Sequence, residues 1–134
     1  MSNSPRESTA DIGVIHLVDD EKDIVAAATR ALEQAGYTVH SFSNPSEALA
    51  DIELKCKKNV GMLISDIRMS VHSGFEVARR TRDIVPDVPV IFMTAFEVNS
   101  KEFEHVFPSF KVNAFLQKPF DVQKLLDVVR KQLN

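Results

Sequence analysis

Strand-length apolar runs alternate with helical patterns along almost the whole of this 134-residue chain. Each run is short and bounded by polar or turn residues, which is typical of β-strands. In order, the runs read VIHLVDD, YTVHSF, VGMLISD, PVIFMTA and NAFLQKP. A helical pattern follows each of them, so a β-α unit repeats five times. This order predicts an α/β fold with a doubly wound parallel sheet that helices cover on both faces.

Capping residues mark the ends of several of these helices. Asn44 precedes a proline and, three residues on, an acid, which is the pattern of an N-cap. Gly36 follows apolar residues at helical spacing and suits the left-handed position after a helix. Asp121 is predicted to cap the last helix, and a fourth helix is predicted within VNSKEFEHVF.

Length and composition fit one globular domain. The hydrophobic fraction is 44% and the charged fraction 26%, and a net charge of -3 gives no basic field for nucleic acid. Cys56 is the only cysteine, which suits a reducing cytoplasm and excludes an internal disulfide. No apolar run reaches the ~18 residues of a membrane span. We expect residues 1–11 to be a flexible N-terminal tail and residues 12–134 to be the domain.

Polar residues follow four of the five predicted strands at the point where each strand ends. Asp19 and Asp20 follow the first strand, Asp66 the third, Thr94 the fourth and Lys118 the fifth. Because parallel strands end at one edge of a sheet, and ligands gather there, we expect these side chains to converge.

The converging residues suit phosphoryl transfer. Three carboxylates repel one another unless a cation lies among them, and hard oxygen ligands suit Mg²⁺. The metal and Lys118 would offset charge on phosphoryl oxygens, Thr94 would donate a hydrogen bond, and one acid would act as nucleophile. Each signal alone is weak, since an acid after a strand usually caps a turn or helix. The five together predict a phosphoryl-transfer site.

With these residues, the chain resembles the receiver domains of two-component response regulators of the chemotaxis-regulator type, over residues 14–133. The motifs that carry the resemblance are VDDE at 18–21, SDIRM at 65–69, Gly74 eight residues after Asp66, MTA at 93–95 and LQKPF at 116–120. The resemblance implies a flavodoxin-like (βα)5 fold with strand order 2-1-3-4-5 and a cytoplasmic location. It also implies a phosphoacceptor signalling domain that catalyses only its own phosphorylation and dephosphorylation.

The resemblance also implies a role for each site residue. Asp66 would accept the phosphoryl group from a sensor histidine kinase, a phosphotransfer protein or a small phosphodonor. Asp20 and Asp66 would bind Mg²⁺ directly, Asp19 through a water molecule, and Arg68 through its backbone carbonyl. Ser70 stands where the family usually has proline.

The remaining roles concern the switch. Lys118 would contact the phosphoryl oxygens, in a Lys118–Pro119 bond that is usually cis in the family, and Thr94 would be the switch hydroxyl. Phosphorylation adds about two negative charges, which would draw both groups inward and leave space for the switch aromatic, Phe115. The fourth helix and fifth strand would then present a new surface to an effector protein or a missing output domain. A homodimer is compatible with the resemblance.

Other assignments remain open from the sequence. The bulky Arg68 and Phe96, two residues after Asp66 and Thr94, lead to the hypothesis that attack by water on an acyl phosphate is slow. Aspartate-nucleophile phosphatases of the haloacid-dehalogenase type also use Mg²⁺, but they need an Asp-x-Asp after the first strand and usually a cap domain. A pseudo-receiver is a third reading, against which the complete set of acids, threonine and lysine argues.

The four histidines are expected to serve structural roles. His16 lies inside the first predicted strand, where a satisfied core histidine is a better interpretation than a metal ligand. His40, His72 and His105 are scattered along the chain, and we expect them at the surface or the rim.

Overall fold

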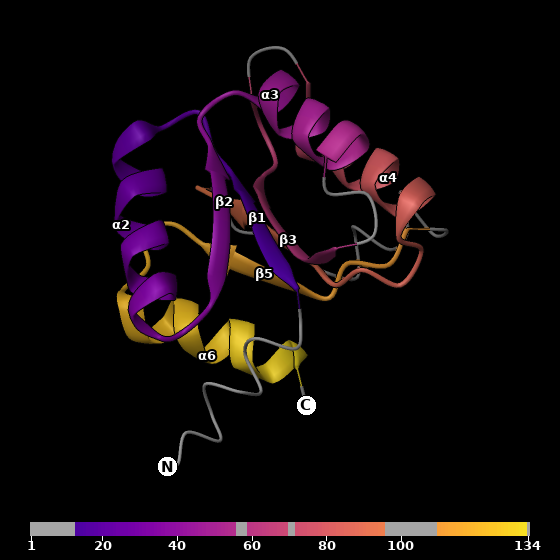
Figure 1. Cartoon of the computed structure of the whole chain (residues 1–134). Helices are drawn as coiled ribbons and strands as arrows, with labels where there is room; N and C mark the ends of the chain where they lie inside the picture. The colour runs from indigo at the N-terminus through magenta and orange to yellow at the C-terminus, as the bar shows by residue number, and fades with distance from the viewer. Residues whose placement is uncertain (1–12, 56–58, 70–71, 96–109, 134) are drawn as a thin grey trace.

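One five-stranded parallel sheet forms the centre of the fold, as the computed structural model shows (Figure 1). The structure describes residues 13–55, 59–69, 72–95 and 110–133. The strands are β1 (Val14–Val18), β2 (Thr38–Phe42), β3 (Val60–Asp66), β4 (Val90–Thr94) and β5 (Ala114–Gln117). Their spatial order is β2-β1-β3-β4-β5 with every pair parallel, which confirms the predicted topology.

Helices cover both faces of this sheet (Figure 1). They are α2 (Lys22–Gln34), α3 (Pro45–Ala50), α4 (Gly74–Ile84) and α6 (Val122–Gln132). A short π-helix, η1 (Asp51–Lys55), continues α3 and was not predicted. The predicted N-terminal tail and the predicted fourth helix lie outside the described residues. Among the described residues, no helix is both long enough and apolar enough to cross a bilayer.

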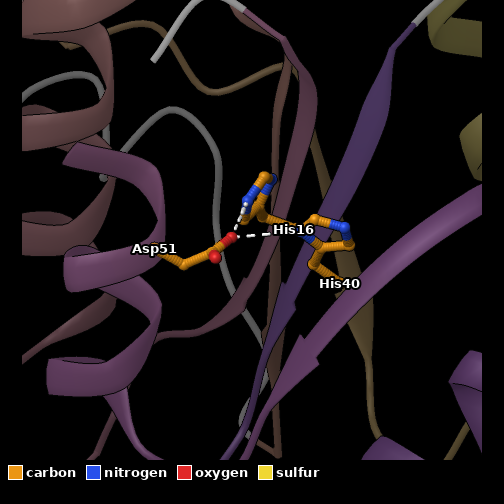
Figure 2. A group of neighbouring side chains, drawn as sticks. All are labelled: His16, His40 and Asp51. Carbon is orange, nitrogen blue, oxygen red and sulfur yellow. Dashed lines mark hydrogen bonds and ion pairs between the residues drawn. The ribbon is translucent and has the colours of Figure 1, made fainter. Parts of the chain in front are cut away.

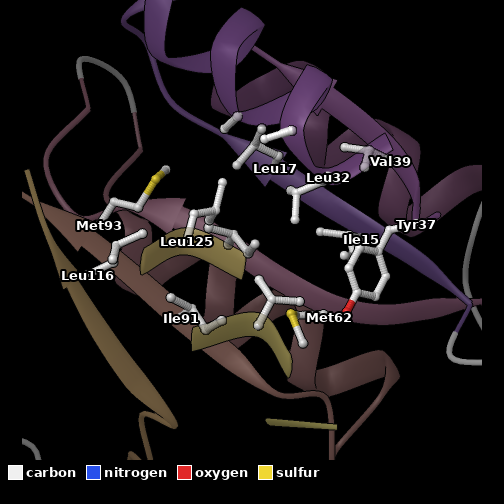
Figure 3. Packing of buried hydrophobic residues seen from close by; sticks show 14 residues of the cluster. Ile15, Leu17, Leu32, Tyr37, Val39, Met62, Ile91, Met93, Leu116 and Leu125 are labelled. Atoms are coloured by element: carbon white, nitrogen blue, oxygen red, sulfur yellow. The ribbon is translucent and has the colours of Figure 1, made fainter. Parts of the chain in front are cut away.

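The core consists of two apolar clusters, one on each face of the sheet. Strand residues such as Ile15, Leu17 and Met62 pack with Leu32 of α2 and Leu125 of α6 in the first cluster (Figure 3). The second cluster packs the other face against α3, η1 and α4. Since side chains alternate along a strand, a strand that is buried on both faces is apolar almost throughout. Acidic residues of the described strands therefore appear only at the end of a strand or directly after it.

The predicted helix ends are confirmed. The side chain of Asn44 accepts a hydrogen bond from the backbone N–H of Ser46 at 2.8 Å, and Asp121 accepts one from Lys124 N at 2.7 Å. Gly36 has a φ of 101°, the left-handed conformation expected after α2. These local signals fix where each helix begins or ends and so keep the crossovers between strands short.

Candidate functional site

Three carboxylates meet at the carboxyl edge of the sheet. Asp19 directly follows β1 and is fully buried, Asp20 is exposed beside it, and Asp66 ends β3 with 8% of its surface exposed. One carboxylate oxygen of each lies within 4.8 Å of those of the other two. The predicted convergence of these acids is confirmed.

Lys118, which follows β5, lies against this acidic group. Its Nζ is 2.7 Å from Asp19 Oδ2 and 3.6 Å from Asp66 Oδ2, and it donates a hydrogen bond to Glu21 Oε1 at 2.8 Å. The contact with Asp19 is close enough for an ion pair but is not aligned as a hydrogen bond. Burial alone would lower the pKa of Lys118, but Asp19, Glu21 and Asp66 together raise it above its usual value. The side chain is therefore a fixed cation.

The environment of Asp66 disfavours its charged form. Burial, followed by the charge of Asp19, raises the pKa of Asp66 to about 6, with Asp20 adding to the effect. Lys118 and the backbone N–H of Ile67 act in the opposite direction but do not cancel it. A carboxylate with a raised pKa beside two further acids is relieved by a divalent cation. Three carboxylate groups at one edge are also the hard oxygen ligands that Mg²⁺ prefers.

Backbone contacts bring Thr94 to the same edge. Thr94 ends β4 and is 6% exposed, and its carbonyl accepts a hydrogen bond from Lys118 N at 2.7 Å. The carbonyl of Met93 likewise accepts from Ile67 N at 3.1 Å, which ties the end of β3 to β4. The bond between Lys118 and Pro119 is cis, as the resemblance implied.

Arg68 and Phe115, the two remaining predicted site residues, differ from the acids in their surroundings. Arg68 is exposed in the segment that follows β3. Phe115 is half-buried in β5, with its ring centroid 6.2 Å from that of Phe92, and packs against the second apolar cluster. Phe96 and Ser70 lie outside the described residues.

Two further residues shape the site and had no predicted role. Glu21 shares Lys118 with Asp19, and the signal that could have indicated this is a third consecutive acid after β1. Gly74 begins α4 and donates its N–H to the carbonyl of Ile67 at 2.8 Å. A Cβ on Gly74 would overlap the carbonyl oxygen of Asp66, so only glycine lets α4 start this close to the end of β3.

The described histidines divide between core and rim as predicted, but His16 is not the fully satisfied core histidine that we expected, because its Nδ1 has no hydrogen-bond partner among the described residues. His16 is fully buried with its Nε2 2.9 Å from Asp51 Oδ2, and burial lowers its pKa more than Asp51 raises it. His40 is 40% exposed by its side chain, and His72 pairs with Glu76 at 2.9 Å. His105 lies outside the described residues.

Comparison with known proteins identifies this arrangement. The sequence profile described as "Response regulator receiver domain" matches residues 15–130. The chain belongs to the response regulator receiver domain family. As a receiver domain, it is a signalling module of two-component systems, and the family binds Mg²⁺ at an acidic pocket of the kind that Asp19, Asp20 and Asp66 form here.

The proteins with similar sequences include a transcriptional regulatory protein and a response regulator receiver protein. The chain is 32% identical over 117 residues to the C4-dicarboxylate transport transcriptional regulatory protein DctD of Rhizobium meliloti, covering 87% of this chain and 24% of that protein. It is 31% identical over 119 residues to the response regulator receiver protein CpdR of Brucella abortus, covering 89% of this chain and 95% of that protein. The chain thus spans about a quarter of the length of DctD and nearly all of the length of CpdR.

Solved structures agree with the fold. The chemotaxis protein CheY4 of Vibrio cholerae superposes with a TM-score of 0.76 at 27% sequence identity, covering 89% of this chain and 97% of that one. The receiver domain of the hybrid histidine kinase CckA superposes with a TM-score of 0.75 at 29% identity, covering 91% of this chain and all of that one (100%).

Proposed function

We propose that Asp66 is the phosphoacceptor of this receiver domain. An oxygen of its carboxylate attacks the phosphorus of a phosphohistidine, the new O–P bond forms, and the P–N bond breaks. The electron pair of that bond stays on the imidazole nitrogen of the donor, which takes up a proton. The observation that carries the proposal is the position of Asp66 at the end of β3, 8% exposed and beside two acids and a lysine.

The metal that this chemistry needs is Mg²⁺. Asp20 and Asp66 would hold it directly, Asp19 through a water molecule, and the backbone carbonyl of Arg68 would supply a further oxygen. The fit rests on oxygen donors from three carboxylates within 4.8 Å of one another and on the raised pKa of Asp66. When bound, Mg²⁺ supplies positive charge to the phosphoryl oxygens and to the carboxylates around them.

Lys118 and Thr94 complete the proposed site. The ammonium of Lys118 already lies 3.6 Å from Asp66 Oδ2, within reach of a phosphoryl oxygen on that residue. The hydroxyl of Thr94 is carried at the end of the adjoining strand and would donate a second hydrogen bond. Both groups stabilise charge that grows on the phosphoryl oxygens during transfer.

In the proposed switch, phosphorylation changes the surface around β5 that partner proteins contact. When Thr94 moves toward the phosphoryl group, the half-buried ring of Phe115 would turn into the space that Thr94 leaves, which changes the surface around β5. The predicted fourth helix, on which this surface also depends, lies outside the described residues. The partners would be a sensor histidine kinase or phosphotransfer protein on one side and an effector protein or output domain on the other, in the cytoplasm. The domain would transmit this signal and would catalyse only its own phosphorylation and dephosphorylation.

The proposal is tested by mass spectrometry after incubation with acetyl phosphate and Mg²⁺. The wild-type domain should gain one phosphate, whereas Asp66→Asn should gain none. A matched control is Asp83→Asn, since Asp83 is an exposed acid of α4 outside the site, and this variant should be phosphorylated like the wild type. Phosphorylation of Asp66→Asn to the wild-type level would refute the assignment.

The same experiment separates the phosphatase alternative. A receiver retains a phosphate on its own chain, whereas an aspartate-nucleophile phosphatase releases inorganic phosphate continuously from added phosphoesters. Adjacent acids after β1, in place of the Asp-x-Asp that such phosphatases need, favour the receiver.

A further inference from the structure

A second group of metal-binding side chains lies away from the acidic site. It consists of His16 from β1, His40 from β2 and Asp51, where α3 passes into η1 (Figure 2). His16 and His40 are directly paired in the parallel register of the two strands. His16 lies three residues before Asp19, which corresponds to about 10 Å along a strand. The group is therefore distinct from the site at the carboxyl edge.

The two imidazoles converge on one oxygen. Nε2 of His16 is 2.9 Å and Nδ1 of His40 is 3.0 Å from the same Oδ2 of Asp51. Dashed lines mark these two contacts in Figure 2. The three donor atoms all lie within 4.8 Å of one another. They come from two strands and a helix end, so the backbone holds them together over sequence separations of up to 35 residues.

Hydrogen bonding alone leaves this group incompletely satisfied. If Nε2 of His16 donates its proton to Asp51, Nδ1 keeps a lone pair, and Nδ1 is buried with no hydrogen-bond partner among the described residues. The backbone of Val14 lies near enough to act on the ring but is not aligned as a hydrogen bond. A buried polar atom without a partner carries a desolvation cost.

Metal binding would give each ring nitrogen of His16 a different role. Nε2 would give its lone pair to the ion, and the proton would lie on Nδ1. Histidines that bind metals commonly turn their second nitrogen, as a donor, toward a backbone carbonyl or a carboxylate. The tautomer that suits a metal thus places a donor, rather than a lone pair, at the buried Nδ1.

We propose that His16, His40 and Asp51 form a binding site for a borderline divalent transition metal ion of the Zn²⁺ class. Two imidazoles and one carboxylate are a donor set that Zn²⁺ takes with a water molecule in the fourth position. Mg²⁺ prefers oxygen donors, so the two sites of this domain would select different ions. The ion would tie the junction of α3 and η1 to the two neighbouring strands.

Two of the three distances between ligand atoms need only a small adjustment. Bonds of about 2.0–2.1 Å in a tetrahedral arrangement place ligand atoms roughly 3.3 Å apart, a few tenths of an ångström beyond the two present contacts. The side chain of His40 is 40% exposed and that of Asp51 is 15% exposed, whereas that of His16 is 0% exposed. An ion can therefore arrive from solvent through His40 and Asp51 and reach a buried third ligand.

The test is a titration of the protein with ZnCl₂, followed by long-range ¹H–¹⁵N NMR of the histidine rings. To remove competing ligands, the protein carries Cys56→Ser and Asp66→Asn. We expect Nε2 of His16 and Nδ1 of His40 to shift together, to saturate at one equivalent, and to return when the ion is chelated. MgCl₂ should leave both resonances in place.

Variants assign the site without disturbing the core. His40→Gln removes a partly exposed ligand and should weaken Zn²⁺ affinity at least tenfold, measured by competition with a chromophoric chelator. Asp51→Asn keeps an acceptor oxygen but loses the charge, and it should weaken affinity likewise. The matched control His72→Gln removes a histidine that pairs with Glu76 in α4, and it should leave affinity unchanged. Equal affinity of His40→Gln and wild type, or shifts confined to His72 or His105, would overturn the proposal.

Discussion

Replacing Gly74 with alanine tests whether the close approach of α4 to the end of β3 holds the backbone of Asp66 in place. The added Cβ would overlap the carbonyl oxygen of Asp66 and lie 3.0 Å from Cα of Ile67. Carbon atoms in contact are normally about 3.5–4.0 Å apart. Since both obstacles are backbone atoms, no side-chain rotation relieves them, and either α4 or the end of β3 must move.

The size of the effect follows from two opposing contributions. Overpacking of a well-packed site costs about 1–3 kcal/mol. Alanine is a better helix former than glycine by at most about 1 kcal/mol, and Gly74 is the first residue of α4. We therefore expect the free energy of unfolding to fall by about 1–2 kcal/mol. Because the displaced atoms belong to Asp66 and its neighbour, the rate of phosphorylation should also fall.

Urea denaturation measures the first effect, and the rate of phosphate incorporation from acetyl phosphate with Mg²⁺ measures the second. Gly36→Ala is the matched control, because Gly36 has a φ of 101° at the end of α2, opposite the carboxyl edge. It should lose about 1–2 kcal/mol through backbone strain but retain the wild-type phosphorylation rate. A Gly74→Ala protein with wild-type stability and wild-type phosphorylation would refute the steric reasoning.

Two further predictions concern the charges of the site, and a third concerns a hydrogen bond at the start of β4. The pKa of Asp66 is about 6, and Mg²⁺ competes with the proton for this carboxylate. Mg²⁺ affinity measured by calorimetry should therefore be constant above pH 6 and fall up to roughly tenfold per pH unit below it. An affinity that stays the same from pH 7 to pH 5 would contradict this. Lys118→Gln removes a charge that lowers the pKa of Asp66, so ¹³C NMR of the carboxyl group should show that pKa rising above about 6; an unchanged or lower pKa would contradict it. The backbone N–H of Val90 donates a hydrogen bond to Asn113 Oδ1 at 2.9 Å, and Asn113→Ala removes this acceptor. The free energy of unfolding, measured by urea denaturation, should fall by about 1–3 kcal/mol, and the phosphorylation rate should not change.

The sheet and the acidic site follow from the sequence because both depend on short-range patterns. Apolar runs give the strands, and the alternation with helices forces a parallel sheet. Once the strands are parallel, the residues after each strand must meet at one edge, so Asp19, Asp66 and Lys118 could be placed together before their distances were known. The caps at Asn44 and Asp121 are local for the same reason, since each bonds a backbone N–H only two or three residues away.

Contacts that depend on strand register or on an irregular helix could not be predicted from the sequence. His16 and His40 were read separately, as a core residue and a rim residue, because nothing in the chain states that the two strands pair them directly. Asp51 lies where α3 passes into a π-helix, a change that no capping signal predicts, and it meets the two histidines over separations of 35 and 11 residues. The pairing of Glu21 with Lys118, over a separation of 97 residues, likewise needed the folded chain.

The charge balance at the carboxyl edge explains why metal and phosphate should bind in a set order. In the part of the chain that the structure describes, the carboxylates of Asp19, Glu21 and Asp66 lie against the ammonium of Lys118, and the carboxylate of Asp20 lies beside those of Asp19 and Asp66. Burial and the charges of Asp19 and Asp20 raise the pKa of Asp66 to about 6, and Lys118 offsets only part of that rise. A phosphoryl group would add about two more negative charges at the same place. Mg²⁺ should therefore bind first, and phosphorylation without it should be slow, because the incoming phosphoryl oxygens would meet the uncompensated carboxylates.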